Sequence, residues 1–146
     1  MAFSDAQLRR YARQIVLPDV GGVGQERLLA AAVRVEHAVG AGAAAILYLA
    51  AAGVGRIVVT DGGVVDAAGW LYEASDVGRA RLDAAVERVA EQNPDVRVVA
   101  SGPWDVTVEL ADGSDGSDGS DGSDGSDGGD GDGARAAGRA IRSLLA

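Results

Sequence analysis

The stretch VRVEHAVGAGAAAILYLAAAGVGRIVVTD, Val33 to Asp61, has the pattern of a strand, a helix and a second strand in succession. Its residues predict a strand over 33–38, a helix almost without polar side chains over 43–52, and a β-branched strand over 56–61. Short β-branched runs are typical of buried parallel strands, and a nearly all-apolar helix is typical of a buried position. The stretch therefore predicts a βαβ unit with an acidic residue, Asp61, at the end of its second strand.

The flanking sequence continues this alternation of helices and strands. Ser4 and Gln7 have the spacing of a capping box ahead of an amphipathic helix. Because helices and strands alternate, the chain predicts an α/β fold, a mostly parallel, doubly wound, Rossmann-like sheet that is truncated and preceded by N-terminal helices. The other predicted elements are helices over 5–15, 25–32 and 76–92 and strands over 96–100 and 106–110.

The C-terminal part of the chain has a different composition. Residues 113–133, GSDGSDGSDGSDGSDGGDGDG, contain no apolar side chain, which predicts a flexible Gly-Ser-Asp linker. A calcium-binding β-roll is disfavoured because it needs a nine-residue period with an apolar position. Residues 134–146 predict a short helix that docks on the domain or on a partner. The expected organisation is a domain over 1–112, the linker, and this helix.

The composition excludes several classes of function. The chain of 146 residues is long enough for one domain, and it contains no cysteine, so a thiol nucleophile and a cysteine-ligated zinc site are excluded. The net charge is −9 and no basic stripe predicts nucleic-acid binding. The longest apolar run is too short to cross a bilayer, so the sequence predicts no membrane contact and a soluble, cytoplasmic protein.

The turn after the first predicted strand is a candidate nucleotide site. Gly40-Ala-Gly42-Ala-Ala-Ala45 has the form GxGxxA, and Asp61 stands about twenty residues further on, where a ribose-binding carboxylate belongs. In such turns the glycines let the backbone approach a phosphate at the N-terminus of a helix. The alternative is a tightly packed crossover helix with no ligand, and the glycine pattern by itself leaves both interpretations open.

Four phrases together carry a resemblance to a known family. They are RYARQIVLPDVGGVGQERLLAA (Arg10–Ala31), YLAAAGVGRIVVTDGGVVD (Tyr48–Asp66), DVGRARLDAAVERVAEQNPDVRV (Asp76–Val98) and DVTVELAD (Asp105–Asp112). In this order and spacing they resemble the ThiF/MoeB/HesA family, bacterial relatives of ubiquitin-activating enzymes. The resemblance implies a homodimeric Rossmann-like domain that binds ATP and Mg²⁺ and adenylates the C-terminal carboxylate of a ubiquitin-like sulfur carrier.

The resemblance also implies roles for particular residues. Arg13 matches the arginine of the RYxRQ motif that reaches across the dimer to the nucleotide phosphates. Asp61 matches the ribose-binding acid, and Asp112, which ends DVTVELAD, matches the aspartate linked to magnesium. Arg81 falls on a lysine of the family and keeps its charge. Of the family's glycine loop, Gly40 and Gly42 remain glycine.

Other family positions are replaced. Aligned without gaps back from Tyr48, two glycines of the loop fall on His37 and Val39, and the branched side chain of Val39 stands where the backbone should approach a phosphate. The phosphate-binding arginine of the family becomes Tyr72, and its asparagine becomes Gly69. These replacements predict that ATP and Mg²⁺ binding is weak or lost.

Two neighbouring polar residues need a structural explanation. A lone histidine between a strand and a helix, His37, predicts a packed or capping side chain rather than a catalyst. Glu36 is expected at a sheet edge or in an ion pair with Arg34 or Arg56, because an unpaired charge on a buried strand is costly.

Three functions follow from the sequence. The first is an adenylyltransferase of this family, with impaired or lost catalysis and without zinc, acting on the carboxylate of a ubiquitin-like carrier protein, an amino acid or a peptide. The second is a non-catalytic scaffold that forms a homodimer, or a heterodimer with a related protein. The third is a domain that binds NAD through Asp61, for which no hydride-transfer substrate domain follows.

Overall fold

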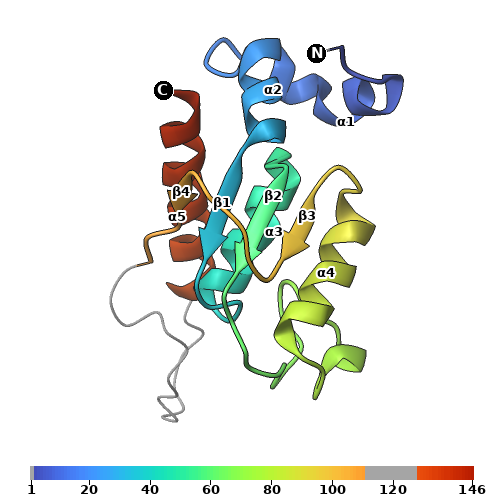
Figure 1. Cartoon of the computed structure of the whole chain (residues 1–146), viewed down its shortest axis with the longest axis vertical. Coiled ribbons are helices and arrows are strands. Elements are labelled where there is room, and N and C mark those ends of the chain that lie inside the picture. Colours follow the sequence, from blue (N-terminus) through green and yellow to red (C-terminus); the bar gives the residue numbers. More distant parts are fainter. Residues whose placement is uncertain (1, 111–127) are drawn as a thin grey trace.

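The computed structural model describes residues 2–110 and 128–146, and it confirms an α/β fold. Its four strands form one parallel sheet in the order β3-β2-β1-β4 (Figure 1). The order along the chain is α1 (Asp5–Ile15), α2 (Gly21–Ala30), β1 (Ala32–Val35), α3 (Ala41–Ala52), β2 (Arg56–Val59), the 3-10 helix η1 (Ala74–Asp76), α4 (Arg81–Gln92), β3 (Arg97–Val99), β4 (Val106–Thr107) and α5 (Gly128–Leu145).

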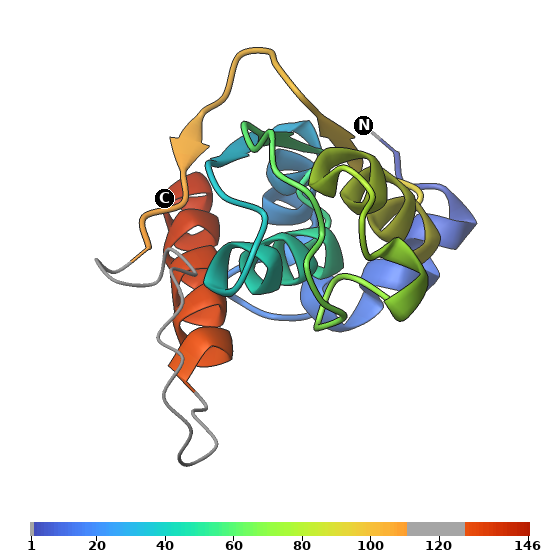
Figure 2. The same ribbon diagram turned by 90° about the horizontal axis from the view of Figure 1, so that it is seen from below.

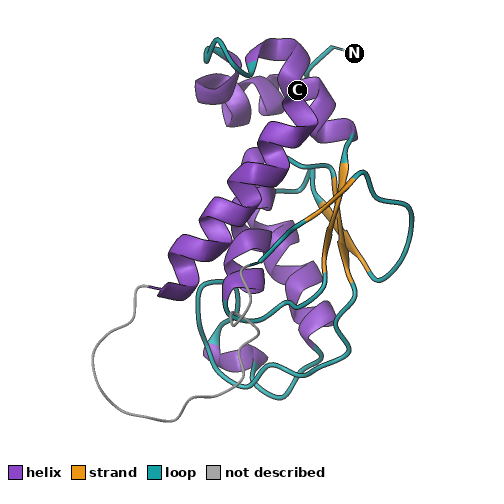
Figure 3. Ribbon diagram, turned by 90° about the vertical axis from the view of Figure 1, so that its left-hand side faces the viewer, coloured by secondary structure: helices purple, strands orange, loops and turns teal. Residues whose placement is uncertain are grey.

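The described helices gather on one side of the sheet. Figure 3 shows the strands nearly edge-on with the helices on one side of them, and Figure 2 shows α5 running beside α3. The buried core lies between the sheet and these helices, and Val33, Ile57 and Val98 contribute to it from three neighbouring strands at paired positions. Alternate strand residues therefore face the helical layer, as the period of a strand requires.

Helix α3 is the central helix of this layer. Most of its residues are buried, including Ala43, Ile46 and Leu49, as its nearly all-apolar sequence predicts. Gly40, with φ 53°, precedes the first turn, and Gly53, with φ 83°, ends the helix in the left-handed conformation.

Two glycines allow α3 to approach its neighbours closely. A Cβ atom added at Gly42 would lie 1.6 Å from the carbonyl oxygen of His37, which follows β1. A Cβ atom added at Gly133 of α5 would lie 2.3 Å from the carbonyl oxygen of Ala41. The start of α3 is therefore packed against the β1 loop on one side and against α5 on the other.

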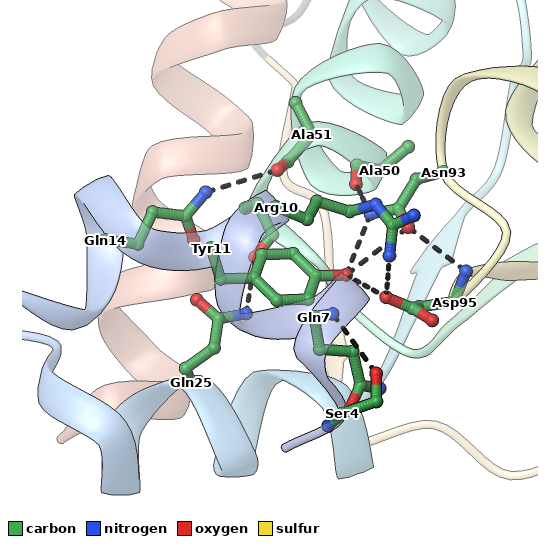
Figure 4. Close-up of polar contacts among 11 residues, drawn as sticks. Ser4, Gln7, Arg10, Tyr11, Gln14, Gln25, Ala50, Ala51, Asn93 and Asp95 are labelled. Atoms are coloured by element: carbon green, nitrogen blue, oxygen red, sulfur yellow. Dashed lines mark hydrogen bonds and ion pairs between the residues drawn. The ribbon is translucent and has the colours of Figure 1, made fainter.

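Polar contacts hold the N-terminal helices on this core (Figure 4). The predicted capping box of α1 is present, with Ser4 and Gln7 bonding each other's backbone N–H groups. The fully buried Tyr11 donates its hydroxyl hydrogen to Asp95 at 3.0 Å and accepts from the Asn93 amide at 2.9 Å. The same amide donates to the carbonyl of Ala50 at 2.8 Å, so α1 is linked to both α3 and the end of α4.

Some predicted boundaries are wrong. The helix expected over 76–92 is divided, because the buried Asp76 carboxylate accepts hydrogen bonds from the Glu73 N–H and from the Arg79 side chain and so holds a 3-10 turn ahead of α4. The strand expected over 106–110 extends only over β4. Other boundaries also differ from the predicted ones. Helix α2 begins at Gly21 rather than residue 25, and β1 ends at Val35 rather than residue 38. Helix α3 begins at Ala41 rather than residue 43, and β2 ends at Val59 rather than residue 61.

The C-terminal helix also begins earlier than expected, at Gly128 rather than at Ala134. The described part of the expected linker, residues 128–133, is thus helical. Glycine has a low helix propensity, but packing against α3 overrides it, because only a residue without a side chain fits at Gly133. The remainder of the predicted linker, residues 113–127, lies outside the described residues.

We expect Gly42→Ala to destabilise the protein by about 3 kcal/mol or more, because the added methyl group overlaps the His37 carbonyl and forces α3 away from β1. Urea denaturation followed by circular dichroism measures this loss. Gly62→Ala is the matched control, since a Cβ atom at Gly62 meets nothing within 4 Å. Equal stability of the two variants would contradict the packing argument.

Candidate functional site

The predicted site lies where β1 and β2 end. The loop His37–Gly40 follows β1, and Asp61 follows β2, so both stand at the carboxyl edge of the sheet. In open α/β sheets, ligands bind at this edge because the loops there leave a crevice. The N-terminus of α3 begins at the same place. The site is therefore built from the loop, Asp61, and the segments that pack against them.

The Asp61 carboxylate is bonded on both oxygens. Oδ2 accepts the N–H of Ala38 at 2.8 Å and Oδ1 accepts the N–H of Gly63 at 2.7 Å. Nη1 of Arg81 lies 3.2 Å from Oδ2, and the Asp61 side chain is only 6% exposed. Burial by itself raises the pKa of Asp61, but the two N–H groups and the guanidinium outweigh it and hold the pKa below its ordinary value. Asp61 is thus a buried anion directed at the protein's own backbone.

Tyr72 completes the bonding of the same loop. Its buried hydroxyl donates to the carbonyl oxygen of Ala38 at 2.6 Å. Burial, with the charge of Asp61 nearby, raises the pKa of Tyr72 well above its ordinary value, so the hydroxyl keeps its proton. Both backbone polar groups of Ala38 are therefore satisfied by side chains that come from after β2.

The first turn of α3 uses its own N–H groups in a similar way. The N–H of Gly42 donates to the Val39 carbonyl at 3.0 Å, and the N–H of Ala44 donates to the Gly40 carbonyl at 3.1 Å. A phosphate cradle needs such N–H groups directed at the ligand. The Ala44 bond is the ordinary first bond of the helix, whereas the Gly42 N–H belongs to the groups that a helix start leaves free, and here it is used within the turn.

Arg81 stands between two carboxylates. Its Nη1 contacts Asp61, and its Nη2 lies 3.0 Å from Asp66. Burial opposes the charge of Arg81, but these two carboxylates raise its pKa, so it remains a cation. Its positive charge is compensated within the protein, and the site as a whole presents no excess positive charge to a phosphate.

A cavity of about 250 Å³ opens beside the loop. Its walls come from the start of α3 and from the segment between β2 and η1, and most of the lining side chains are apolar. The lining residues are Val39, Gly40, Ala43, Val65, Asp66, Ala67, Ala68, Gly69, Trp70, Leu71, Tyr72 and Arg81.

The structure brings four of the predicted site residues together. Gly40, Gly42, Asp61 and Arg81 all lie around the loop or the start of α3. Arg13 lies apart from them, exposed on α1, which stands at the opposite end of the sheet in Figure 1. Asp112 lies outside the described residues.

The two neighbouring polar residues are also placed. His37 is exposed, so the expectation of a packed side chain is wrong; its backbone carbonyl, not its ring, contacts α3. Glu36 lies just after β1 and forms an ion pair with Arg34 at 3.0 Å, one of the two pairings expected from the sequence.

Sequence reasoning missed the contacts of Tyr72 and Gly63. The position of Tyr72 indicated that an arginine is lost, but no sequence signal indicated that its hydroxyl would bond the loop. Gly63 donates its N–H to Asp61, and a Cβ atom at Gly63 would lie 2.7 Å from Nη1 of Arg81. The close approach of Arg81 therefore depends on a glycine that no motif had marked.

Comparison with known proteins identifies the family. Residues 11–111 match the ThiF family, which is more than half of the chain. The chain belongs to the ThiF family. This assignment confirms the resemblance inferred from the four sequence phrases, and the ThiF relatives below share the Rossmann-like fold.

Relatives of this ThiF-family chain include adenylyltransferases. It is 42% identical over 101 residues to the probable adenylyltransferase/sulfurtransferase MoeZ of Mycobacterium tuberculosis, covering 66% of this chain and 26% of that protein. It is 42% identical over 129 residues to the sulfur carrier protein adenylyltransferase of Thermus thermophilus, covering 77% of this chain and 48% of that protein. The chain thus spans less than half the length of these relatives.

A solved structure shares the fold. Escherichia coli tRNA N6-threonylcarbamoyladenosine dehydratase, TcdA, in complex with ATP matches with a TM-score of 0.60 at 26% identity, over 69% of this chain and 43% of that chain. The ThiF family includes proteins that bind ATP, as this complex shows.

Two further observations concern the described residues only. Across 2–110 and 128–146, no group of three or more histidine, aspartate or glutamate side chains is arranged to hold a metal ion. No helix in the same part of the chain combines the length and apolar character that a bilayer-crossing helix requires.

We expect Asp61→Asn to destabilise the fold by about 1–3 kcal/mol at neutral pH, because a charged acceptor of two backbone N–H groups is lost. A depressed carboxyl pKa stabilises the native state above the unfolded value, near 3.8, and this stability is lost as the pH falls through the lower native pKa. The variant should therefore lose less stability on acidification than the wild type. Urea midpoints between neutral and acidic pH measure this, with the exposed Asp83→Asn as control.

Proposed function

We propose that this chain is a ThiF-family domain of the adenylyltransferase type in which ATP binding and catalysis are impaired or lost. The proposal depends mainly on one observation: the polar groups of the loop after β1 are hydrogen-bonded to side chains of the protein itself. Asp61 and Tyr72 satisfy both backbone groups of Ala38, and Arg81 is bonded to two carboxylates. The groups that would meet a nucleotide are bonded to one another.

The reaction of the family defines what such a site has to do. A substrate carboxylate oxygen attacks the α-phosphorus of ATP, the bond to the β-phosphate oxygen breaks, and an acyl adenylate and pyrophosphate result. Catalysis of this step depends on positive charge and N–H donors that hold the phosphates in line. The substrate class proposed for this chain, from its relatives, is the C-terminal carboxylate of a ubiquitin-like or sulfur-carrier protein.

Two features weigh against a phosphate at the start of α3. The Gly42 N–H donates to the Val39 carbonyl, and Val39, a branched residue, lines the cavity. The Asp61 carboxylate already accepts two backbone N–H groups and contacts Arg81, so a ribose hydroxyl would compete with these partners. Loss of one backbone partner would cost about 1–3 kcal/mol, because a buried donor would be left without its acceptor. Magnesium binding would depend on Asp112.

A specific observation favours a second function, a non-catalytic scaffold that forms a homodimer or a heterodimer with a related protein. Large apolar side chains around α1 and the start of α2 are exposed, namely Leu8, Val16, Leu17 and Val23. Clustered exposed apolar residues mark protein contact surfaces. Arg13, on the same helical segment, is exposed, and its side chain forms no hydrogen bond or ion pair within residues 2–110 and 128–146.

We expect titration calorimetry with Mg-ATP to give a Kd of about 1 mM or weaker. ATP–pyrophosphate exchange should be absent or slow, and any exchange should vanish in Asp112→Ala. The Thermus thermophilus sulfur carrier protein adenylyltransferase is the positive control. Micromolar binding of Mg-ATP to this chain would overturn the proposal of an impaired site.

We expect the paired change Val16→Asp and Val23→Asp to weaken self-association about tenfold or more, because two apolar side chains become charged at the proposed contact surface. Sedimentation equilibrium of the full chain measures the association. Val86→Asp, at an exposed apolar position on α4, is the control. A wild-type chain that remains monomeric, or variants that associate equally, would contradict the homodimer.

A further inference from the structure

The cavity beside the loop differs in character from a phosphate site. Val39, Ala43, Val65 and Leu71 give it apolar walls, and Tyr72 is also among the lining residues. Pockets with apolar walls and few polar groups bind ligands mainly by removing apolar surface from water. The cavity is therefore suited to an uncharged group.

The charged groups near the cavity leave no free positive charge. Arg81 and Asp66 both line it, and they form an ion pair with each other, while Asp61 holds the other side of the Arg81 guanidinium. An anion entering the cavity would lose its hydration and meet no uncompensated cation. Burying a charge without a partner is strongly unfavourable, so the cavity should reject phosphates.

An exposed aromatic residue, Trp70, lies at the edge of the cavity. Trp70 is among the residues that line the cavity and is nevertheless 65% exposed. The neighbouring Gly69 donates its N–H to the Tyr72 carbonyl, which turns the segment back and leaves Trp70 at its tip. An exposed indole beside an apolar cavity offers a flat surface on which a ring can stack.

The size of the cavity limits its occupant. Its volume of about 250 Å³ is below the range of about 300–1,000 Å³ that is usual for sites of drug-sized ligands. A single ring system fits such a volume better than a complete nucleotide with its phosphates. Ring stacking on Trp70 and burial against Val39 and Leu71 would then supply the affinity.

We propose that this cavity binds an uncharged planar ring, stacked against Trp70, and discriminates against the same ring when it carries phosphates. The ring can come from a nucleoside base or from an aromatic side chain of a peptide. The proposal rests on the proposed function, because it requires that the phosphate cradle is lost.

Three probes separate the sources of the ring. Adenosine offers the base without phosphates, ATP offers the same base with them, and N-acetyl-phenylalaninamide offers an aromatic side chain. Each is titrated into the full chain while the indole N–H signals of Trp70 and Trp104 are followed by NMR, with Trp104→Phe assigning the two signals. We expect the Trp70 signal to move, the Trp104 signal to stay, and adenosine to bind about tenfold or more tightly than ATP.

Two variants locate the binding. Ala43→Leu, which fills the cavity from α3, should weaken adenosine binding about tenfold, whereas Ala51→Leu, at an exposed position of the same helix, should leave it unchanged. Trp70→Ala changes an exposed side chain, so the fold should persist while calorimetry records the loss of the stacking contribution. A response to adenosine alone assigns the cavity to a base, a response to the amide alone assigns it to a peptide, and a response to both supports a general ring site.

The proposal fails if neither uncharged probe moves the Trp70 signal at millimolar concentration, or if Ala43→Leu and Ala51→Leu bind adenosine equally. It also fails if ATP binds more tightly than adenosine. These failures are distinguishable from that of the proposed function. If none of the three probes binds, the ring-binding proposal fails and the proposal of an impaired ATP site stands. If ATP binds with micromolar affinity, both proposals fail.

Discussion

The site depends on one carboxylate, that of Asp61. It joins the loop after β1 through the Ala38 N–H, the turn after β2 through the Gly63 N–H, and α4 through Arg81. Because the carboxylate is buried, it remains charged only if these partners stay in place. Three segments that are separate along the chain are thereby held at one edge of the sheet.

Close packing around α3 imposes the second constraint. Gly42 allows the helix to touch the His37 carbonyl, and Gly133 allows α5 to touch the Ala41 carbonyl. Most of the nearly all-apolar surface of α3 is buried, and α5 packs against it together with β1, β2 and α4. A short chain can therefore bury its central helix with the elements it has.

The replacements within the ThiF pattern form a connected set. Tyr72 stands where the family resemblance places an arginine, and it bonds Ala38. Arg81 stands where that resemblance places a lysine, and its planar guanidinium contacts Asp61 and Asp66 at once. Residues that match the family's nucleotide-binding positions thus stabilise the domain by contacting one another. A residue of the family's type at one of these positions is consequently weak evidence that this chain binds the family's ligand.

The sequence by itself determined the parallel α/β class, the buried character of α3, the extent of α1 and the ThiF family, because these depend on local periodicity, capping and ordered motifs. It indicated that Gly40, Gly42, Asp61 and Arg81 belong to one site. Only the tertiary structure decided that Asp61 bonds the loop, that the Tyr72 hydroxyl closes it, and that α5 begins at Gly128. The physical reason is that these contacts join segments far apart in the chain, where distance and burial, rather than residue type, select each partner.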